Sequence, residues 1–199
     1  MKLVAFTDLH EDKKALKGII EKAKSADFII CAGDISNFGS NLNKMLEILD
    51  NSGKQTLIIP GNHESEYELE KLCKKYKNII NIHKSFFRKD NFLFLGYGDS
   101  GFSIEDKEFD KVSVKFKKIM KKDDKIILVT HAPVYKTKLD YLPWLKEHRG
   151  NNSIRRFIDE VKPMLAICGH FHENFNKVDK INRAIIINPG NHGKTIRIK

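Results

Sequence analysis

Five short segments of this 199-residue chain place aspartate, histidine or asparagine directly after an apolar run of strand length. They are Thr7-Asp8-Leu9-His10, Gly33-Asp34, Gly61-Asn62-His63-Glu64, Thr130-His131 and Gly169-His170-Phe171-His172. A single aspartate after a strand is usually a helix cap, and a single histidine is usually an ordinary core or surface residue. Helix capping does not explain why such a polar residue follows each of five strands. In α/β sheets ligands gather beyond the carboxyl ends of the strands, so we expect these side chains to share one site.

The spacing inside two segments supports a shared site. Asp8 and His10 are two positions apart, as are His170 and His172. Residues two apart on an extended backbone point to the same side, so both members of each pair can face one centre.

The donor chemistry of the segments indicates metal ions. The donors are two carboxylates, four imidazoles and one carboxamide, without a thiolate: Asp8, Asp34, His10, His131, His170, His172 and Asn62. Mixed oxygen and imidazole donors suit Mn, Fe, Zn or Ni, and suit Ca less well. Seven side chains exceed the needs of one tetrahedral zinc but match two ions that share a carboxylate. Two divalent ions would keep a net positive charge beside two carboxylates, which would attract hydroxide and a phosphate group.

Strand and helix signals alternate along most of the chain. The strand-like runs are Leu3–Phe6, Phe28–Cys31, Thr56–Ile59, Phe92–Leu95, Ile126–Val129, Leu165–Cys168 and Ala184–Ile187. Helical apolar periodicity occurs in 16–23, 42–49, 69–76 and 154–161, and more loosely in 109–120. Continuous apolar strands that alternate with helices predict a layered α/β fold. The segment Asn176–Ile198 predicts short antiparallel strands that complete a sheet.

Composition predicts a globular protein with one domain over residues 1–199. Hydrophobic residues make up 41% of the chain and charged residues 31%, and no linker or repeat interrupts it. The apolar runs are far too short to span a membrane, and the chain opens on a strand rather than a signal peptide. Three cysteines, Cys31, Cys73 and Cys168, form no C-x-x-C pair and are expected to be buried and reduced. We therefore expect a cytoplasmic protein without a membrane partner.

The formal net charge of +10 has two interpretations. It suits an acidic partner, either nucleic acid or a phosphorylated small molecule. However, Lys111, Lys115, Lys118 and Lys122 recur at helical spacing opposite an apolar stripe, as on a solvated helix face. The solvated surface is the interpretation that we favour.

In order, the five segments match D-x-H, G-D, G-N-H-[DE], a lone histidine and G-H-x-H. The chain thereby resembles the calcineurin-like metallophosphoesterase superfamily from Asp8 to His172, and Asn188-Pro189-Gly190 resembles the turn that often follows the last block. The resemblance implies a four-layer α-β-β-α sandwich of two mixed sheets flanked by helices. It places the site at the sheet ends.

The resemblance also implies a role for each residue. Two metal ions are expected, with Asp8, His10 and His172 on the first, and Asn62, His131 and His170 on the second. Asp34 would bridge both ions, and a hydroxide between them would attack a phosphomonoester or phosphodiester. His63 would meet the leaving-group oxygen as a general acid or a transition-state donor. Glu64 stands where many members have aspartate, and we expect it to orient His63.

Several residues outside these blocks have two interpretations. The loop from Val134 to Gly150, with His148, forms either a substrate wall or an ordinary packed loop. Arg155 forms either a surface salt bridge or a clamp on a phosphate. His192 either reaches the periphery of the site or lies away from it. His83 is expected at the surface. The run Gly96–Gly101 spells G-x-G-x-x-G, but Phe102-Ser103-Ile104 follows where a dinucleotide-binding fold needs a helix. A turn near the site is expected there.

Three functions compete at this level. The hypothesis that we favour is hydrolysis of a small phosphate ester. The second is a nuclease with the same two-metal site, and the third is a catalytically silent scaffold. The scaffold is disfavoured because all of the motif residues are intact. The sequence leaves open the substrate, the choice between monoester and diester, the native metal (Mn, Fe, Ni, Zn or Mg) and the oligomeric state.

Overall fold

The first sheet carries three of the five polar segments. The computed structural model describes residues 1–98 and 102–198. In this sheet the strand order is β13 (Lys194–Arg197), β1 (Lys2–Phe6), β2 (Phe28–Cys31), β3 (Thr56–Ile58) and β4 (Ile79–Asn81). Strands β1 to β4 run parallel, and β13 pairs antiparallel with β1. The connecting helices are α1 (Lys13–Ala23), α2 (Leu42–Asn51) and α3 (Glu66–Cys73).

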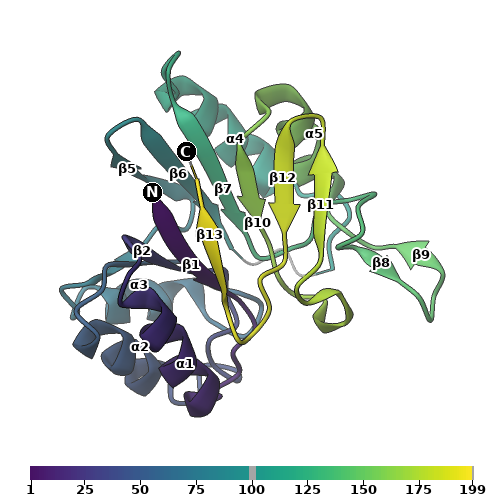
Figure 1. Cartoon of the computed structure of the whole chain (residues 1–199). Helices are drawn as coiled ribbons and strands as arrows, with labels where there is room; N and C mark the ends of the chain where they lie inside the picture. Colours follow the sequence, from purple (N-terminus) through teal and green to yellow (C-terminus); the bar gives the residue numbers. More distant parts are fainter. Residues whose placement is uncertain (99–101, 199) are drawn as a thin grey trace.

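The second sheet carries the other two segments. Its strand order is β11 (Val178–Ile181), β12 (Ala184–Ile187), β10 (Leu165–Ile167), β7 (Lys125–Thr130), β6 (Phe92–Tyr97) and β5 (Ser85–Lys89). The central strands are parallel, and the edge strands β5 and β11 are antiparallel to their neighbours. Helices α4 (Lys107–Ile119) and α5 (Asn152–Val161) belong to this half. A two-stranded ribbon of β8 (Tyr141–Leu142) and β9 (Glu147–His148) projects beside it (Figure 1).

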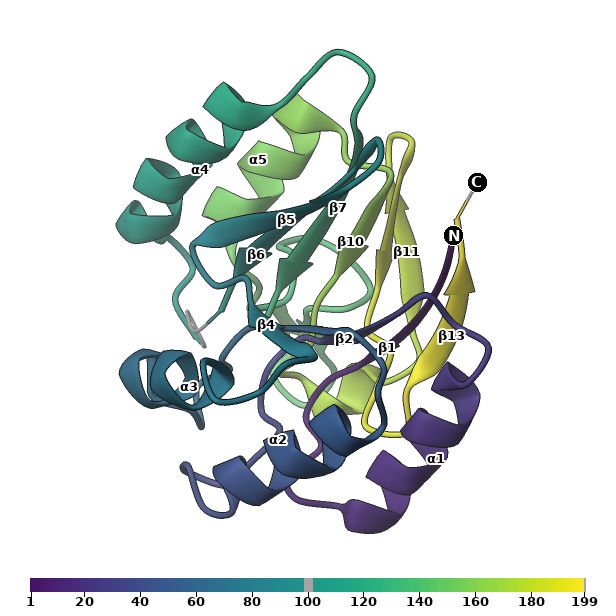
Figure 2. The same ribbon diagram turned by 90° about the vertical axis from the view of Figure 1, so that its left-hand side faces the viewer.

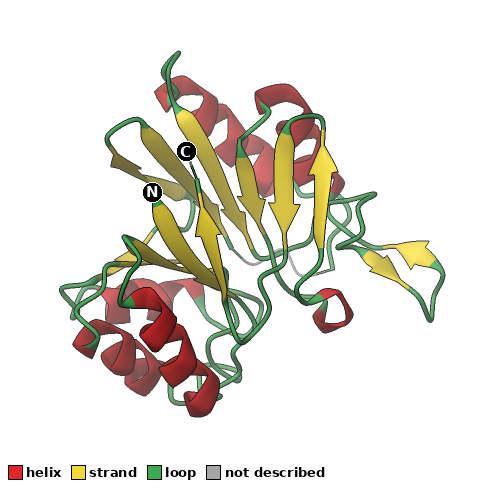
Figure 3. Cartoon of the chain, viewed as in Figure 1, coloured by secondary structure: helices red, strands yellow, loops and turns green. Residues whose placement is uncertain are grey.

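Three hydrophobic layers hold the sheets and helices together. Side chains such as Phe94, Ile127 and Leu57 are fully buried between the two sheets. One outer layer packs α1, α2 and α3 on the first sheet, and the other packs α4 and α5 on the second. Figures 2 and 3 show the two groups of helices on opposite outer faces of the paired sheets. The chain thus forms the four-layer α-β-β-α sandwich predicted from the sequence.

The predicted elements are confirmed, and the additions are short or polar. All seven apolar runs fall on strands, all five periodic segments fall on helices, and β11 and β13 are antiparallel as expected. The sequence missed β4, β5, β8 and β9, because strands of two or three residues, or with exposed charges, give no continuous apolar run. The three cysteines are free and buried.

His83 corrects one expectation. Its side chain is only 5% exposed rather than at the surface. Its Nδ1 accepts a hydrogen bond from the Gly98 backbone N–H at 2.8 Å, and its Nε2 lies 3.0 Å from Glu66. His83 therefore fixes the end of β6, where the glycine-rich run begins; residues 99–101 of that run lie outside the described residues.

None of the helices in the described ranges is both long and apolar enough to cross a membrane.

Candidate metal centre

The polar segments converge because their strands end at the same edge of the sandwich. β1, β2 and β3 lie side by side in one sheet, and β7 and β10 lie side by side in the other. The ends of β1, β7 and β10 point toward the same side of the molecule in Figure 1. Hydrogen bonds tie the loops together there: Gly169 N–H donates to the carbonyl of His131, and His170 N–H donates to the Asp8 carboxylate.

Seven of the predicted site residues, His63 among them, form three overlapping groups of atoms that could bind metal. Within each, the atoms lie inside 4.8 Å of one another: Asp8 with His10 and His172, His10 with Asp34 and His63, and Asp34 with His131 and His170. The amide oxygen of Asn62 is 3.0 Å from His131 Nε2, which brings in the last predicted residue. All eight residues therefore meet in one centre. Asp34 belongs to the second and third groups and connects them, and His10 belongs to the first and second.

Buried hydrogen bonds fix the orientation of the imidazoles. His131 is fully buried, and its Nδ1–H donates to the Ala32 carbonyl at 2.9 Å. Its Nε2 then faces Asp34 at 3.4 Å. His10 is oriented in the same way by Asn37, whose amide oxygen is 3.0 Å from His10 Nδ1, while His10 Nε2 faces His172 Nε2 at 3.3 Å. Such partners commonly set which ring nitrogen meets a metal.

Asn37 was missed by the sequence reasoning. It lies three residues beyond Asp34, outside the motif blocks, and only its contact with His10 reveals its place. The available signal was its position in a polar turn directly after the G-D block.

Strained backbone concentrates at this centre. Asp8, His10, Asp34 and His170 all have positive φ, at 51°, 46°, 52° and 72°. Left-handed conformations are uncommon for residues other than glycine, and their clustering is typical of functional sites. These conformations occur where the chain leaves β1, β2 and β10 beside the centre.

Two glycines of the motifs allow this close packing. A Cβ atom at Gly61 would collide with the carboxylate of Asp34, and one at Gly169 would collide with the hydroxyl of Thr7. Neither gap accommodates a methyl group. The glycines in G-N-H and G-H-x-H therefore let the loops after β3 and β10 approach the segments that carry Asp34 and Asp8.

Buried charges are paired at the centre. Burial alone would raise the pKa of Asp34, but the hydrogen bond and charge of His131 outweigh it and hold the pKa at about 2. Burial alone would lower the pKa of His131, whereas Asp34 raises it to about 9. Burial, together with the His131 charge, lowers the pKa of His170 to about 4. The His131–Asp34 pair thus lies beside a neutral imidazole, and a cation that binds this pair displaces a proton.

The donor set fits divalent metal ions. Nε2 of His170 is buried and has no hydrogen-bond partner among the described residues. A buried polar atom without a partner is costly unless something else satisfies it. It lies within the group of Asp34 and His131, and the Nε2 atoms of His10 and His172 lie 3.3 Å apart beside the Asp8 carboxylate. A cation would satisfy these nitrogens.

Glu64 holds the loops rather than the His63 ring. Its Oε2 accepts hydrogen bonds from the N–H groups of Asp34 and Gly61, both at 2.9 Å. Its Oε1 accepts from the N–H and hydroxyl groups of Ser36 at 2.9 and 2.7 Å. The expectation that Glu64 orients His63 is wrong, because these bonds engage both of its oxygens with the backbone around Asp34. The ring of Phe38 contacts His63 instead, with centroids 4.1 Å apart.

Glu64→Gln should lower the free energy of unfolding by about 2–3 kcal/mol, because an amide N–H would face backbone N–H groups that the carboxylate now satisfies. Urea unfolding of the metal-free protein measures the change. Glu68→Gln, on the exposed face of α3, is the matched control and should cost less than about 0.5 kcal/mol. Equal losses in the two variants would show that Glu64 does not tether these loops.

Three residues with open roles lie elsewhere. His148 binds the buried carboxylate of Asp140 at 2.8 Å within the β8–β9 region. Arg155 pairs with Asp159 and donates to the carbonyl of Tyr135, which agrees with the salt-bridge interpretation. The side chain of His192 is exposed. The loop Val134–Gly150 contributes no lining residue to the pocket over the centre, within the part of the chain that is described.

That pocket has a volume of about 470 Å³ and is lined by predicted site residues with two additions, Asn37 and Phe102. Phe102 is 75% exposed, and its ring meets that of His170 with centroids 4.4 Å apart. The sequence predicted a turn near the site at Gly96–Gly101, but no motif marked Phe102, the residue that follows it.

Comparison with known proteins agrees with this geometry. The family model described as calcineurin-like phosphoesterase matches residues 1–174. The uncharacterized protein MJ1162 of Methanocaldococcus jannaschii is 31% identical over 199 residues, which cover 95% of this chain and 88% of the relative.

Solved structures show the same fold. TT1561 of Thermus thermophilus aligns with a TM-score of 0.78 at 17% identity, covering 96% of this chain and 89% of that one. A dimetal phosphatase from Danio rerio aligns at 0.65 and 11% identity, covering 94% and 86%. A novel archaeal phosphodiesterase aligns at 0.55 and 16% identity, covering 96% and 84%. With its sequence blocks gathered at one centre and the family model spanning most of its length, the chain belongs to the calcineurin-like phosphoesterase family.

Proposed function

We propose that this protein hydrolyses a small phosphomonoester or phosphodiester at a centre of two divalent metal ions. The observation that carries the proposal is the position of Asp34. Its carboxylate belongs both to the group with His10 and His63 and to the group with His131 and His170. One carboxylate between two sets of donors is the arrangement that a bridged pair of ions requires.

The ligands divide between two ions as follows. Asp8, His10 and His172 would hold the first ion, and Asn62, His131 and His170 would hold the second, with Asp34 shared. When bound, the ions would lower the pKa of a water molecule and neutralise charge on the phosphate. We infer Mn, Fe, Ni or Zn, or less favourably Mg, because imidazoles contribute four of the seven ligands.

The protein's own residues position the reaction. Thr7 donates to the Asp8 carboxylate at 2.7 Å, and Asn37 and Ala32 set the orientation of His10 and His131. The backbone N–H of His63 donates to Asp34 at 2.9 Å, which fixes the start of its side chain beside the centre. His63 would donate a proton or a hydrogen bond to the leaving-group oxygen. Its Nε2 is 4.0 Å from Asp34, as is that of His10, so this distance does not separate a donor from a ligand.

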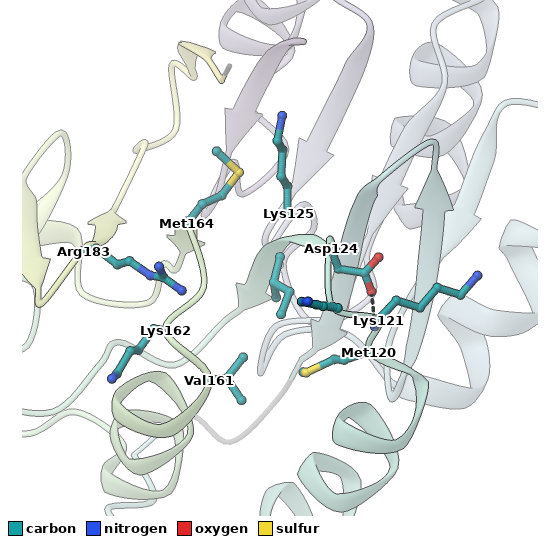
Figure 4. A pocket seen from close by; sticks show the side chains of 10 residues that line it. Met120, Lys121, Asp124, Lys125, Val161, Lys162, Met164 and Arg183 are labelled. Atoms are coloured by element: carbon teal, nitrogen blue, oxygen red, sulfur yellow. Dashed lines mark hydrogen bonds between the residues drawn. The ribbon is translucent and has the colours of Figure 1, made fainter.

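A nuclease using the same centre is the second candidate, and the distribution of charge disfavours it. The described residues that line the pocket over the centre include no lysine and no arginine. A cation-rich cavity of about 460 Å³ lies elsewhere, lined in part by Lys121, Lys125, Lys162 and Arg183 (Figure 4). It lies at the start of β7, whereas His131 follows the end of that strand. The length of β7 separates them by about 20 Å.

A substrate panel tests the proposal. Phosphomonoesters, phosphodiesters and nucleic acids, each assayed with Mn, Fe, Ni, Zn and Mg, should show metal-dependent turnover of small esters. DNA should compete weakly at low salt and not at all at about 200 mM salt, since a phosphate-backbone contact is salt-dependent. Preferred turnover of nucleic acid would establish the nuclease instead. No turnover of any ester with any metal would contradict the proposed function.

A further inference from the structure

Two exposed phenylalanines flank the centre, one from each sheet. Phe38 follows β2 and is 82% exposed, and Phe102 lies beyond β6 and is 75% exposed. Each ring contacts an imidazole of the centre, Phe38 that of His63 and Phe102 that of His170. Large apolar side chains in water beside a polar pocket often mark a binding surface. The fold gains little from them, because most of each ring stays in solvent.

The backbone holds Phe38 in this position. Its φ is 49°, a conformation that bulky residues rarely adopt, and such strain accumulates where a surrounding structure imposes it. The turn is anchored to the loop after β1. The N–H of the preceding Asn37 donates to Glu11 at 3.0 Å, and its side chain bonds His10. These bonds fix the turn that carries the Phe38 ring to His63.

The loop that carries Phe102 is anchored as well. The carbonyl of Ser103 accepts a hydrogen bond from the Asn151 side chain at 3.0 Å, and that of Ile104 accepts one from the Asn152 N–H at 2.7 Å. Phe102 also contacts the ring of Phe171, with centroids 6.2 Å apart. Residues at the start of helix α5 thus anchor the loop that carries Phe102.

We propose that Phe38 and Phe102 form an aromatic clamp that selects phosphate esters whose organic group is a planar aromatic ring, as in a nucleotide base. This inference rests on the proposed function and names its substrate class. A phosphate at the centre leaves its organic group in the open part of the pocket, which Phe102 lines and where Phe38 stands against the lining residue His63. Aromatic faces stack on bases without regard to their hydrogen-bonding pattern, so the clamp selects for planarity rather than for one base.

The kinetic test compares adenosine 5′-monophosphate with ribose 5-phosphate, which carries the same sugar and phosphate without the base; methyl esters of both serve for a diesterase. Phe38→Ala and Phe102→Ala should each lower kcat/KM for the nucleotide about tenfold more than for the sugar phosphate. Phe38→Trp should retain the preference. Trp144→Ala removes an aromatic residue that is 67% exposed on the β8–β9 ribbon, away from the pocket lining, and should change neither rate.

A binding test does not depend on turnover. Phenylphosphonate and cyclohexylphosphonate, titrated into manganese-loaded protein by calorimetry, differ in planarity but carry the same anion. Both alanine variants should weaken phenylphosphonate selectively. Selective losses in both the kinetic and the binding test would show that the clamp accepts aryl esters in general. A selective loss for the nucleotide alone would show that its substrates are nucleotides. The clamp is overturned if each alanine variant loses equal activity on the nucleotide and the sugar phosphate, and equal affinity for the two phosphonates, while the wild-type protein turns over normally. Wild-type protein that hydrolyses no ester contradicts the proposed function instead, while the binding test still decides the clamp.

Discussion

Asp34→Asn should reduce turnover by about 10³-fold or more and should lower metal occupancy at both positions. The substitution keeps the shape of the side chain but removes the negative charge that would lie between two cations. Loss of a partner outside the ligand shell already costs about 10–100-fold in metal affinity or activity, so loss of a shared ligand should cost more. Metal analysis of dialysed protein and steady-state kinetics measure both effects.

Two control variants separate the bridge from general damage. Asn62→Ala removes a neutral ligand of one ion only, and we expect a smaller loss of activity and of metal. Asp140→Asn changes another fully buried aspartate, which accepts bonds from the N–H groups of Thr137 and Gly150. That variant should lose stability but keep its metals. Near-normal rate and metal content in Asp34→Asn would show that Asp34 is not the bridge.

His63→Asn should keep both metals and slow alkyl phosphate esters by about 10²–10⁴-fold, the usual range for general acid catalysis. The effect should be much smaller for p-nitrophenyl esters, because p-nitrophenolate leaves as a stable anion without a proton. His63 follows Asn62 in a turn after β3; the amide oxygen of Asn62 lies against His131, whereas the His63 ring lies against those of His10 and Phe38. Metal content and rates for both kinds of ester are the required measurements.

The outcomes for His63 distinguish three roles. Lost metal would make His63 a ligand, which its group with His10 and Asp34 also allows geometrically. Equal slowing of alkyl and nitrophenyl esters would indicate phosphate binding or charge stabilisation rather than proton donation. His148→Asn, which changes an imidazole bound to Asp140 away from the centre, should leave metals and both rates unchanged.

Much of the fold was predictable because its central strands are continuous apolar runs. β1, β2, β7 and β10 are buried on both faces, and their hydrophobic patterns mark them without ambiguity. Edge strands such as β5 carry exposed charges and gave no such signal. The convergence of the eight motif residues followed from where these strands end. Their roles as ligands or as proton donor stay predictions.

Contacts between loops were not predictable. Glu64 follows His63 in the sequence, yet its carboxylate serves the loop around Asp34, 30 positions away. Asn37, Phe38 and Phe102 reach the centre because turns with left-handed residues and long-range hydrogen bonds place them there. His83 is buried beside the end of β6, where it bonds the Gly98 N–H and stacks on Tyr97, and no local sequence pattern marks it. Local periodicity does not encode such tertiary contacts.

Metal stoichiometry measured beside turnover tests the central claim most directly. Protein stripped with a chelator and then titrated with Mn²⁺ should bind two ions per chain, with activity absent before the titration and full only when both are bound. The Asp34→Asn variant should bind fewer than two ions per chain in the same titration. Full activity in metal-free protein, or saturation of both binding and activity at one ion per chain, would contradict the two-metal account.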